Sequence, residues 1–342
     1  MDSVVKQAIS RLSRGEDLSA GEAEEVFQAI MGGDATQSQI GALLMGLRVK
    51  GETVPEIVGA ATAMRRVSVK IPVRIGEGEV LMDTCGTGGD ASGTFNISTT
   101  VAFIVAASGV KVAKHGNRSI TSRSGSADCL EALGKDLQLT PEQVAREIMD
   151  IGIGFLFAPN LHPAMKYAAG PRKELGIRTI FNLLGPLTNP ANANAQLVGV
   201  FSRELCAPLA EVLGRLGVKN VWVVHGHGGL DEVSIAGPTH VAAWMDGDLD
   251  EFDITPEDAG LERAPIEAIK GGSAVENAAI LRAVLDGREK GPRRDVCLLN
   301  AGAALVVAMK AQTLEEGVRI AQEIIDKKKA VEVLDAYLGT HS

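Results

Sequence analysis

The sequence has few of the features that mark membrane proteins, nucleic-acid-binding proteins or zinc proteins. Its apolar runs, such as "TVAFIVAASGVKVA", are too short and too interrupted to span a bilayer. The 342 residues include only two Trp, two Tyr and eight Phe, and the net charge is −9, so aromatic platforms for bases and a broad basic surface are both lacking. The four cysteines form no C-x-x-C pair, and the N-terminus lacks the pattern of a secretory signal. We therefore expect a cytoplasmic protein that does not bind membranes or nucleic acid.

The first 70 residues predict a bundle of helices. Hydroxyl residues that can cap a helix are followed three positions later by an acid or amide, and each pair precedes a segment with apolar residues at helical spacing. These capping boxes are Ser19 with Glu22, Thr36 with Gln39, and Thr53 with Glu56. The chain therefore begins with a small helical domain.

From about Glu79 short apolar runs alternate with helical segments, which predicts an α/β fold with a mostly parallel central sheet. The expected strands are "EVLMD", "VKVAK", "GFLFA", "AQLVGVF" and "NVWVVHG". A helical, proline-punctuated stretch interrupts this rhythm and is expected to pack with the N-terminal helices. The predicted division is a helical domain of residues 1–72 with 165–192, and a larger α/β domain of residues 73–164 and 193–342.

The segment "DTCGTGGDASGTFNIST", Asp83 to Thr99, follows the first predicted strand and opens a helix. Glycines allow backbone N–H groups to approach an anion closely, and the start of a helix adds unpaired N–H donors. The segment therefore predicts a phosphate or diphosphate site. It matches neither a Walker loop nor a clean dinucleotide motif, and an ordinary turn before a helix cap is the structural alternative.

A basic segment, Lys111 to Arg123, has four Lys or Arg and no acid. It places Lys114 and Arg118 beside the edge of the sheet where the glycine-rich segment lies. A local basic segment in an acidic protein favours a small anionic ligand.

Two further segments carry candidate site residues. In "VVHGHGGLDEVS" the adjacent carboxylates Asp231 and Glu232 follow a strand and are suitable ligands for Mg²⁺, although a solvated acidic pair is an equally simple interpretation. In "LHPAMKYAAGPRKELGIRTIFNLLGP", Arg172 is suited to binding a carboxylate, and His162 lies just ahead. The alternatives are an ion pair of Arg172 with Glu174 and a helix-capping role for His162.

Together these segments resemble the anthranilate phosphoribosyltransferase family over essentially the whole chain. The resemblance rests on "GTGGD", "TFNIST", "KHGNRS", "SGSAD", "HPAM", "GPRKELGIRTIFNLLGPLTNP" and "GLDE", in that order. It implies a fold shared with nucleoside phosphorylases, a homodimer formed through the helical domain, and transfer of the 5-phosphoribosyl group from phosphoribosyl diphosphate to the amine of anthranilate. One departure is Gly228, where the family pattern leads us to expect an acid.

The resemblance also implies the residues of the site. Phosphoribosyl diphosphate would contact Gly86, Gly89, Asp90, Thr94, Asn96, Ile97, Ser98, Thr99, Lys114 and Ser126. Anthranilate would contact Gly86, His115, Asn117, His162, Arg172 and Gly185. Two Mg²⁺ ions per subunit would be bound through Ser98, Asp231 and Glu232, and the catalytic residues would be Lys114, Asp231 and Glu232.

Two other functions fit the same architecture. A pyrimidine nucleoside phosphorylase would handle a ribose C1 with phosphate, but "NRSITSRSGSAD" and the Arg172 segment match the transferase better. A catalytically silent relative that binds nucleic acid would need a basic groove, which the net charge of −9 opposes.

Overall fold

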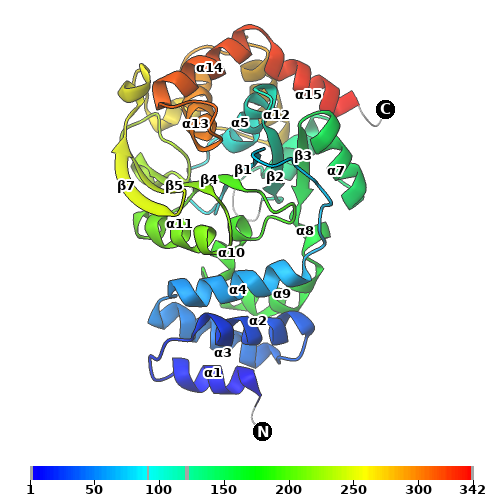
Figure 1. Cartoon of the computed structure of the whole chain (residues 1–342), viewed down its shortest axis with the longest axis vertical. Helices are drawn as coiled ribbons and strands as arrows, with labels where there is room; N and C mark the ends of the chain where they lie inside the picture. Colours follow the sequence, from blue (N-terminus) through cyan, green and yellow to red (C-terminus); the bar gives the residue numbers. More distant parts are fainter. Residues whose placement is uncertain (1–2, 91, 120–122, 340–342) are drawn as a thin grey trace.

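The structure, a computed structural model, describes residues 3–90, 92–119 and 123–339. The ends of the predicted domains (1–2 and 340–342), residue 91 of the glycine-rich segment and residues 120–122 of the basic segment lie outside these ranges. A helical part that carries the N-terminus lies beside a larger part built around a sheet (Figure 1). Within the ranges described, no helix is long and apolar enough to cross a membrane. The predicted fold class, a small helical part with a larger α/β part, is confirmed.

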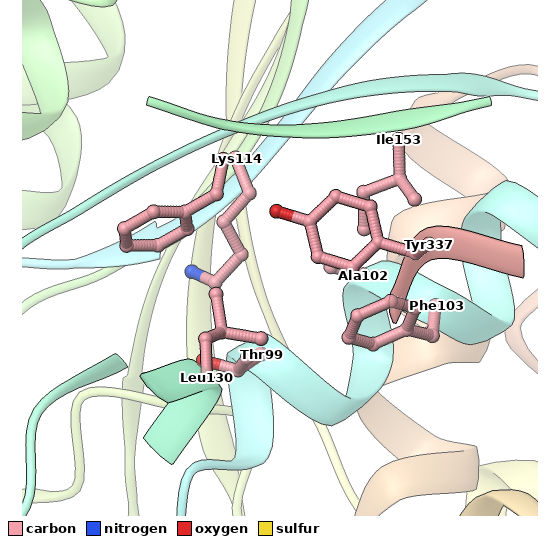
Figure 2. Close-up of a pocket in the computed structure, with 8 residues that line it drawn as sticks. Thr99, Ala102, Phe103, Lys114, Leu130, Ile153 and Tyr337 are labelled. Atoms are coloured by element: carbon pink, nitrogen blue, oxygen red, sulfur yellow. The ribbon is translucent and has the colours of Figure 1, made fainter. Parts of the chain in front are cut away.

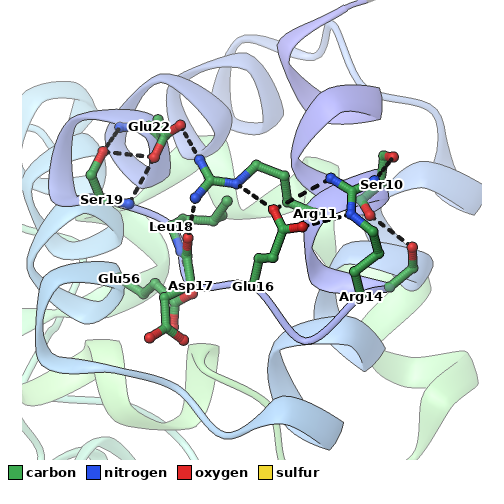
Figure 3. Close-up of polar contacts among 10 residues, drawn as sticks. Ser10, Arg11, Arg14, Glu16, Asp17, Leu18, Ser19, Glu22 and Glu56 are labelled. Atoms are coloured by element: carbon green, nitrogen blue, oxygen red, sulfur yellow. Dashed lines mark hydrogen bonds and ion pairs between the residues drawn. The ribbon is translucent and has the colours of Figure 1, made fainter.

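The N-terminal part consists of four helices, α1 (Val4–Leu12), α2 (Ala20–Gly32), α3 (Gln37–Lys50) and α4 (Val54–Val67). The predicted capping boxes at Ser19 and Thr36 form, and Arg11 of α1 also contacts the box residue Glu22 (Figure 3). The third box is only half made. Glu56 accepts from the N–H of Thr53 at 2.8 Å, but the Thr53 hydroxyl has no partner within the described residues. Glu56 is fully buried and also accepts from the N–H of Leu18, so it joins the start of α4 to the segment before α2.

Two helices from the middle of the chain, α9 (Lys166–Leu175) and α10 (Phe181–Leu187), lie against this helical part. The side-chain amide of Gln37 donates to the carbonyl oxygen of Tyr167 at 3.3 Å. Phe181 packs edge to face on Phe27 of α2, with ring centroids 5.7 Å apart. Helices α9 and α10 therefore pack against the N-terminal helices.

The larger part contains one seven-stranded sheet in the order β3-β2-β1-β4-β5-β6-β7. The strands are β1 (Leu81–Gly86), β2 (Lys111–Gly116), β3 (Ile153–Phe157), β4 (Ala195–Gly199), β5 (Asn220–Gly226), β6 (Thr239–Met245) and β7 (Asp248–Ile254). The first five strands pair in parallel, as predicted, and their carboxyl ends therefore meet at one edge. The antiparallel hairpin β6–β7 was not predicted.

Helices cover both faces of the sheet because successive strand residues point to opposite sides. Leu197 and Trp222 belong to one apolar core, whereas their neighbours Val198 and Val221 belong to the other, which continues into the helical part. The remaining helices are α5 (Ile97–Ala107), α6 (Ser126–Ala132), α7 (Pro141–Asp150), α8 (Ala158–Leu161), α11 (Cys206–Arg215), α12 (Ala274–Leu285), α13 (Pro292–Val307), α14 (Leu314–Asp326) and α15 (Lys329–Gly339). Helix α5 leaves the carboxyl end of β1 through the glycine-rich segment.

Candidate active site

The two carboxylates of the "GLDE" segment bind N–H groups of the glycine-rich segment. Asp231 Oδ2 accepts from the N–H of Gly88 at 2.8 Å, and Glu232 Oε1 accepts from the N–H of Ser98 at 3.1 Å. Gly88 has a φ of 69°, and Ser98 lies in the first turn of α5, where N–H groups have no partner inside the helix. The carboxylates therefore occupy donors that an anionic ligand would use.

Burial makes these carboxylates costly to ionise. It raises the pKa of Asp231, and the nearby Asp90 raises it further. Burial also raises the pKa of Glu232, with a second contribution from the charge of Asp231. Lys114 offsets part of the effect at Glu232. A cation bound between the carboxylates would offset the free-energy cost of holding two negative charges close together in a desolvated site.

Glycines on two neighbouring strands make room for Asp231. A Cβ on Gly86 would lie 2.6 Å from Asp231 Oδ2, and one on Gly199 would lie only 1.5 Å from the backbone oxygen of Asp231. Gly86 ends β1 and Gly199 ends β4, which pair in register. Gly199 was not among the predicted site residues, because its role depends on a contact between segments far apart in the sequence.

Lys114 lies behind the glycine-rich segment, as the strand pattern predicted. Its side chain is buried, and its ammonium group donates to the carbonyl oxygen of Thr84 and to the hydroxyl of Ser98, the latter at 3.4 Å. Thr99 and Tyr337 line a small, mainly apolar cavity beside it (Figure 2). The ammonium group therefore supports both ends of the segment with one positive charge.

The oxygen atoms around the acid pair are suitable for Mg²⁺. Carboxylate and hydroxyl oxygens are the ligands this ion prefers, and Asp90 Oδ2 is buried without a hydrogen-bond partner among the described residues. The described residues contain no cluster of three or more acidic, His or Cys side chains that could hold a metal ion. Mg²⁺ usually keeps several waters and binds substrate phosphates, so a site that offers a few protein oxygens beside an anion site fits it.

A pair of buried histidines forms the second half of the site. His115 Nδ1 lies 3.2 Å from the carbonyl oxygen of Gly185, and the two Nε2 atoms of His115 and His162 are 3.3 Å apart. Because a carbonyl oxygen only accepts, Nδ1 of His115 carries a proton, and its Nε2 accepts from Nε2–H of His162. Burial lowers the pKa of His115 to about 3 and that of His162 to about 4, so both rings are neutral near pH 7.

Asp83 and Asn189 hold the strand that carries Lys114 and His115, although neither was predicted as a site residue. Asp83 is fully buried and accepts from the N–H of His115 at 3.1 Å and from the amide of Asn189 at 2.8 Å. Asn189 also donates to the carbonyl oxygen of Ala113 at 2.9 Å. Burial raises the pKa of Asp83, and Lys114 opposes this effect. The network fixes β2 relative to β1 at the site.

Arg172 lies on α9, half-buried, with its guanidinium carbon 5.3 Å from the centroid of the Phe181 ring. The part of the chain that the structure describes shows no ion pair between Arg172 and Glu174, which was the alternative role for this residue. Burial lowers the pKa of Arg172. A partly desolvated guanidinium of this kind is suited to an incoming carboxylate.

The second half of the glycine-rich segment is held by residues that lie just before and at the start of α12. Thr94 pairs with Lys270, and the amide of Asn277 donates to Asn96 Oδ1 at 3.0 Å. Ile97 is buried in the core and its N–H donates to the carbonyl oxygen of Phe95, so its side chain does not face the site. Thr99 is also buried. The fixed half of the segment thus places the start of α5.

The basic segment contributes less positive charge than its sequence indicated. Arg118 is exposed and pairs with Asp128 and Glu131, so its charge is neutralised locally. Asn117 and Ser126 lie next to each other at the start of α6, with the Ser126 hydroxyl 3.3 Å from the carbonyl oxygen of Asn117. Within the described ranges, no hydrogen bond joins these two residues to the acid pair.

Comparisons with known proteins agree with this geometry. Residues 78–331 match the α/β domain of a glycosyl transferase family, and residues 6–68 match the helical bundle domain of the same family. An anthranilate phosphoribosyltransferase of Symbiobacterium thermophilum is 55% identical over 331 residues, covering 97% of this chain and 96% of the relative. The chain belongs to the anthranilate phosphoribosyltransferase family.

Solved structures of anthranilate phosphoribosyltransferases have the same fold. The crystal structure of the enzyme from Thermus thermophilus is 47% identical with a TM-score of 0.92, covering 99% of this chain and 98% of that one. The enzyme from Saccharomyces cerevisiae in complex with PRPP and Mg is 30% identical with a TM-score of 0.88, again covering 99% and 98%. These relatives support a phosphoribosyltransferase rather than the phosphorylase or the nucleic-acid-binding alternative.

Membership of the anthranilate phosphoribosyltransferase family makes the contact at Gly199 testable. Gly199→Ala should displace the backbone of Asp231 and raise the KM for phosphoribosyl diphosphate on the order of tenfold or more, since small misplacements in a site have large effects. Gly41→Ala is the matched control, because a Cβ on Gly41 in α3 would meet nothing within 4 Å. Steady-state kinetics measure the KM for phosphoribosyl diphosphate in each protein. Equal KM values for wild type and Gly199→Ala would show that this close approach does not position Asp231.

The neutral histidines should give the protein a characteristic acid sensitivity. A buried His with a lowered pKa binds fewer protons when the protein is folded than when it is unfolded. Its contribution to the free energy of unfolding is therefore complete above the unfolded-state pKa of about 6.5, and it is lost as the pH falls toward the pKa of the folded state. For His162 the loss is about 3 kcal/mol between pH 6.5 and 4. Asp231 and Glu232, with raised pKa values, act in the opposite direction, so a variant must be compared with wild type.

His162→Gln should therefore show a shallower loss of unfolding free energy between pH 6.5 and 4 than wild type, measured by urea denaturation of the metal-free protein. The variant should be less stable at pH 7, because His115 loses a hydrogen bond. The slope, not the absolute stability, is the informative quantity. An identical slope in both proteins would mean that folding does not lower the pKa of His162.

Proposed function

We propose that the protein transfers the 5-phosphoribosyl group of phosphoribosyl diphosphate to the amine of anthranilate, giving N-(5-phosphoribosyl)anthranilate and diphosphate. The observation that carries this proposal is the contact of Asp231 and Glu232 with the N–H groups of Gly88 and Ser98. Carboxylates that can bind a cation and N–H groups that can bind an anion then lie within hydrogen-bond distance of each other. A metal-bound diphosphate has the charges that match both.

The donor substrate would lie along the glycine-rich segment. Its oxygens would replace the carboxylates as acceptors from the loop N–H groups, while Lys114 adds positive charge from below. The residues proposed to contact it are Gly86, Gly89, Asp90, Thr94, Asn96, Ile97, Ser98, Thr99, Lys114 and Ser126. For Ile97 and Thr99, whose side chains are buried, such contact would involve the backbone.

Mg²⁺ would be held by Ser98, Asp231 and Glu232, with two ions per subunit. The ions would neutralise the negative charge that accumulates on the departing diphosphate. Lys114 and the N–H groups of the loop stabilise the same charge without any movement of a proton. Together with the acid pair, Lys114 is the proposed catalytic group.

The acceptor substrate would lie between the histidine pair and α9. Arg172 would bind the carboxylate of anthranilate, and Gly86, His115, Asn117, His162 and Gly185 would line the same space. The amine of anthranilate is neutral near pH 7 and can form its bond to C1 as the bond from C1 to the diphosphate oxygen breaks. Because both histidines are neutral and hydrogen-bonded, they position the amine and do not need to remove a proton beforehand. The extra proton on the nitrogen would leave after the bond to C1 has formed, to solvent or to the departing diphosphate.

The organisation of the chain follows from the same proposal. We infer a helical domain of residues 1–72 with 165–192, and an α/β domain of residues 73–164 and 193–342 that binds phosphoribosyl diphosphate. Contacts of α9 with α2 and α3 support this division. We also infer a cytoplasmic homodimer formed through the helical domain, which the exposed Val49 on α3 supports.

A fluorescence assay tests the proposed activity. Anthranilate fluorescence should fall only when enzyme, phosphoribosyl diphosphate and Mg²⁺ are all present, and one diphosphate should be released for each anthranilate consumed. Omission of Mg²⁺ or addition of a chelator should abolish the signal. Unchanged fluorescence with all components present would contradict the proposed reaction, and turnover of uridine or thymidine with phosphate would favour a nucleoside phosphorylase.

A further inference from the structure

Arg178 occupies a position between the two halves of the site that the predicted residues leave unexplained. It lies in the short segment between α9 and α10, and its guanidinium carbon is 4.2 Å from the centroid of the Phe201 ring. Phe201 lies two residues after the end of β4, in the α/β part. The side chain thus reaches from the segment that carries Arg172 and Gly185 to the carboxyl edge of the sheet.

The guanidinium also touches the glycine-rich segment. A terminal nitrogen of Arg178, Nη1, lies 3.5 Å from the carbonyl oxygen of Gly89, and a Cβ on Gly89 would be 4.0 Å from the same nitrogen. A hydrogen bond of that length is weak, so the contact places the group without holding it firmly. Gly89 follows Gly88, whose N–H is bound by Asp231. Arg178 therefore rests beside the donors proposed to bind diphosphate.

Arg178 differs from the other arginines that contact acids on the surface. It is exposed, and across residues 3–90, 92–119 and 123–339 no carboxylate lies within 4 Å of it, whereas Arg118, Arg203 and Arg215 each pair with an acid. Guanidinium has five N–H donors in a rigid plane, and stacking on Phe201 fixes the orientation of that plane. The result is an oriented cation whose donors are mostly unused.

The site has more negative than positive groups, so a further cation would stabilise a bound diphosphate. Asp90, Asp231 and Glu232 bring three acidic groups to the glycine-rich segment, and Lys114 is the positive group that the structure places directly beneath it. A diphosphate adds further negative charge. Arg178 contacts a different part of the segment from Lys114, because Lys114 contacts Thr84 and Ser98 whereas Arg178 contacts Gly89.

We propose that Arg178 is a substrate-binding residue that donates to the diphosphate of phosphoribosyl diphosphate and so determines the affinity for the donor substrate. This inference depends on the proposed function. The competing ligand is the carboxylate of anthranilate, which has similar chemistry. The diphosphate is favoured because the guanidinium contacts the glycine-rich segment, and no described contact joins it to His115 or His162.

The test uses inorganic diphosphate with Mg²⁺, titrated calorimetrically into wild type, Arg178→Ala and Arg172→Ala. Arg178→Ala should weaken diphosphate binding about ten- to 100-fold, as expected for loss of a charge-assisted hydrogen bond, and Arg172→Ala should leave it unchanged. Arg178→Lys should recover only part of the loss, since an ammonium group cannot both stack and donate in a plane. Arg215→Ala, which removes a surface arginine of α11, is the matched control and should bind as wild type does.

Two further results separate the possible explanations. Phe201→Leu removes the aromatic platform and should weaken diphosphate binding less than Arg178→Ala does; its melting temperature is measured alongside, because Phe201 also packs against the apolar core. Equal diphosphate affinity in wild type and Arg178→Ala would overturn the inference, as would a variant whose only change is a higher KM for anthranilate. If wild type itself fails to bind diphosphate with Mg²⁺, the proposed function fails first.

Discussion

Replacing Asp231 by Asn or Glu232 by Gln should lower kcat/KM for phosphoribosyl diphosphate on the order of 100-fold or more at fixed, subsaturating Mg²⁺. Each carboxylate is half-buried and binds an N–H group of the glycine-rich segment, where an amide supplies no charge to a cation. The KM for anthranilate should change much less. A Mg²⁺ titration of the initial rate, with both substrates varied in turn, measures both effects.

The same variants should behave differently without metal. In the structure Asp231 and Glu232 occupy the N–H groups that diphosphate would use, so in chelator they compete with it for these donors. Asp231→Asn should therefore bind diphosphate in chelator at least as well as wild type, although it binds more weakly with Mg²⁺. Asp246→Asn, in the exposed turn between β6 and β7, controls for the change in net charge. Weaker binding of Asp231→Asn under both conditions would show that Asp231 only holds the loop.

Arg172→Ala should raise the KM for anthranilate about ten- to 150-fold, which corresponds to a hydrogen bond to a charged group of roughly 1.5 to 3 kcal/mol. The KM for phosphoribosyl diphosphate should stay nearly unchanged. Arg172 is half-buried over Phe181 and has no acidic partner within the described chain, so its donors are available to a carboxylate. Arg172→Lys should recover part of the loss, because a point charge cannot reproduce the planar guanidinium.

A substrate analogue separates recognition of the carboxylate from a structural role of Arg172. With 2-aminobenzamide, which retains the amine but lacks the carboxylate charge, wild type should react poorly and Arg172→Ala should add only a small further penalty. Lys173→Ala, on the same helix and exposed, should behave as wild type with both compounds. An equal penalty for anthranilate and 2-aminobenzamide in Arg172→Ala would mean that Arg172 maintains the structure and that the carboxylate binds elsewhere.

The local features of the fold could be predicted because each depends on residues that are close together in the sequence. The capping boxes at Ser19 and Thr36 and the start of α5 after the glycine-rich segment depend on residues within a few positions of each other. The hairpin β6–β7 was not predicted, because β7 is rich in acids that are rare in strands. The sequence does contain an Asp-Gly pair, Asp246 and Gly247, that is typical of a two-residue hairpin turn, and both residues have the positive φ that such a turn requires.

The site could be predicted only as far as its motifs reach. Lys114 lies in the second half of β2 and the acid pair follows β5, and the parallel order of the sheet brings the carboxyl ends of these strands to one edge. The contacts of Gly199 with Asp231, Asn189 with Asp83 and Arg178 with Gly89 join residues far apart in the sequence. Arg118 was misjudged for the same reason, since its acidic partners Asp128 and Glu131 are brought to it by the turn into α6.

A crystal structure of the protein with phosphoribosyl diphosphate and Mg²⁺ tests most directly whether the glycine-rich segment and the acid pair together bind a metal-bound diphosphate. The decisive quantity is the acceptor of the Gly88 N–H, which in the present structure is Asp231 Oδ2 at 2.8 Å. We predict that a diphosphate oxygen takes this place at about 3 Å and that Asp231 turns toward Mg²⁺. If Asp231 still accepts from Gly88 while the diphosphate lies away from the segment, the account of the site is wrong.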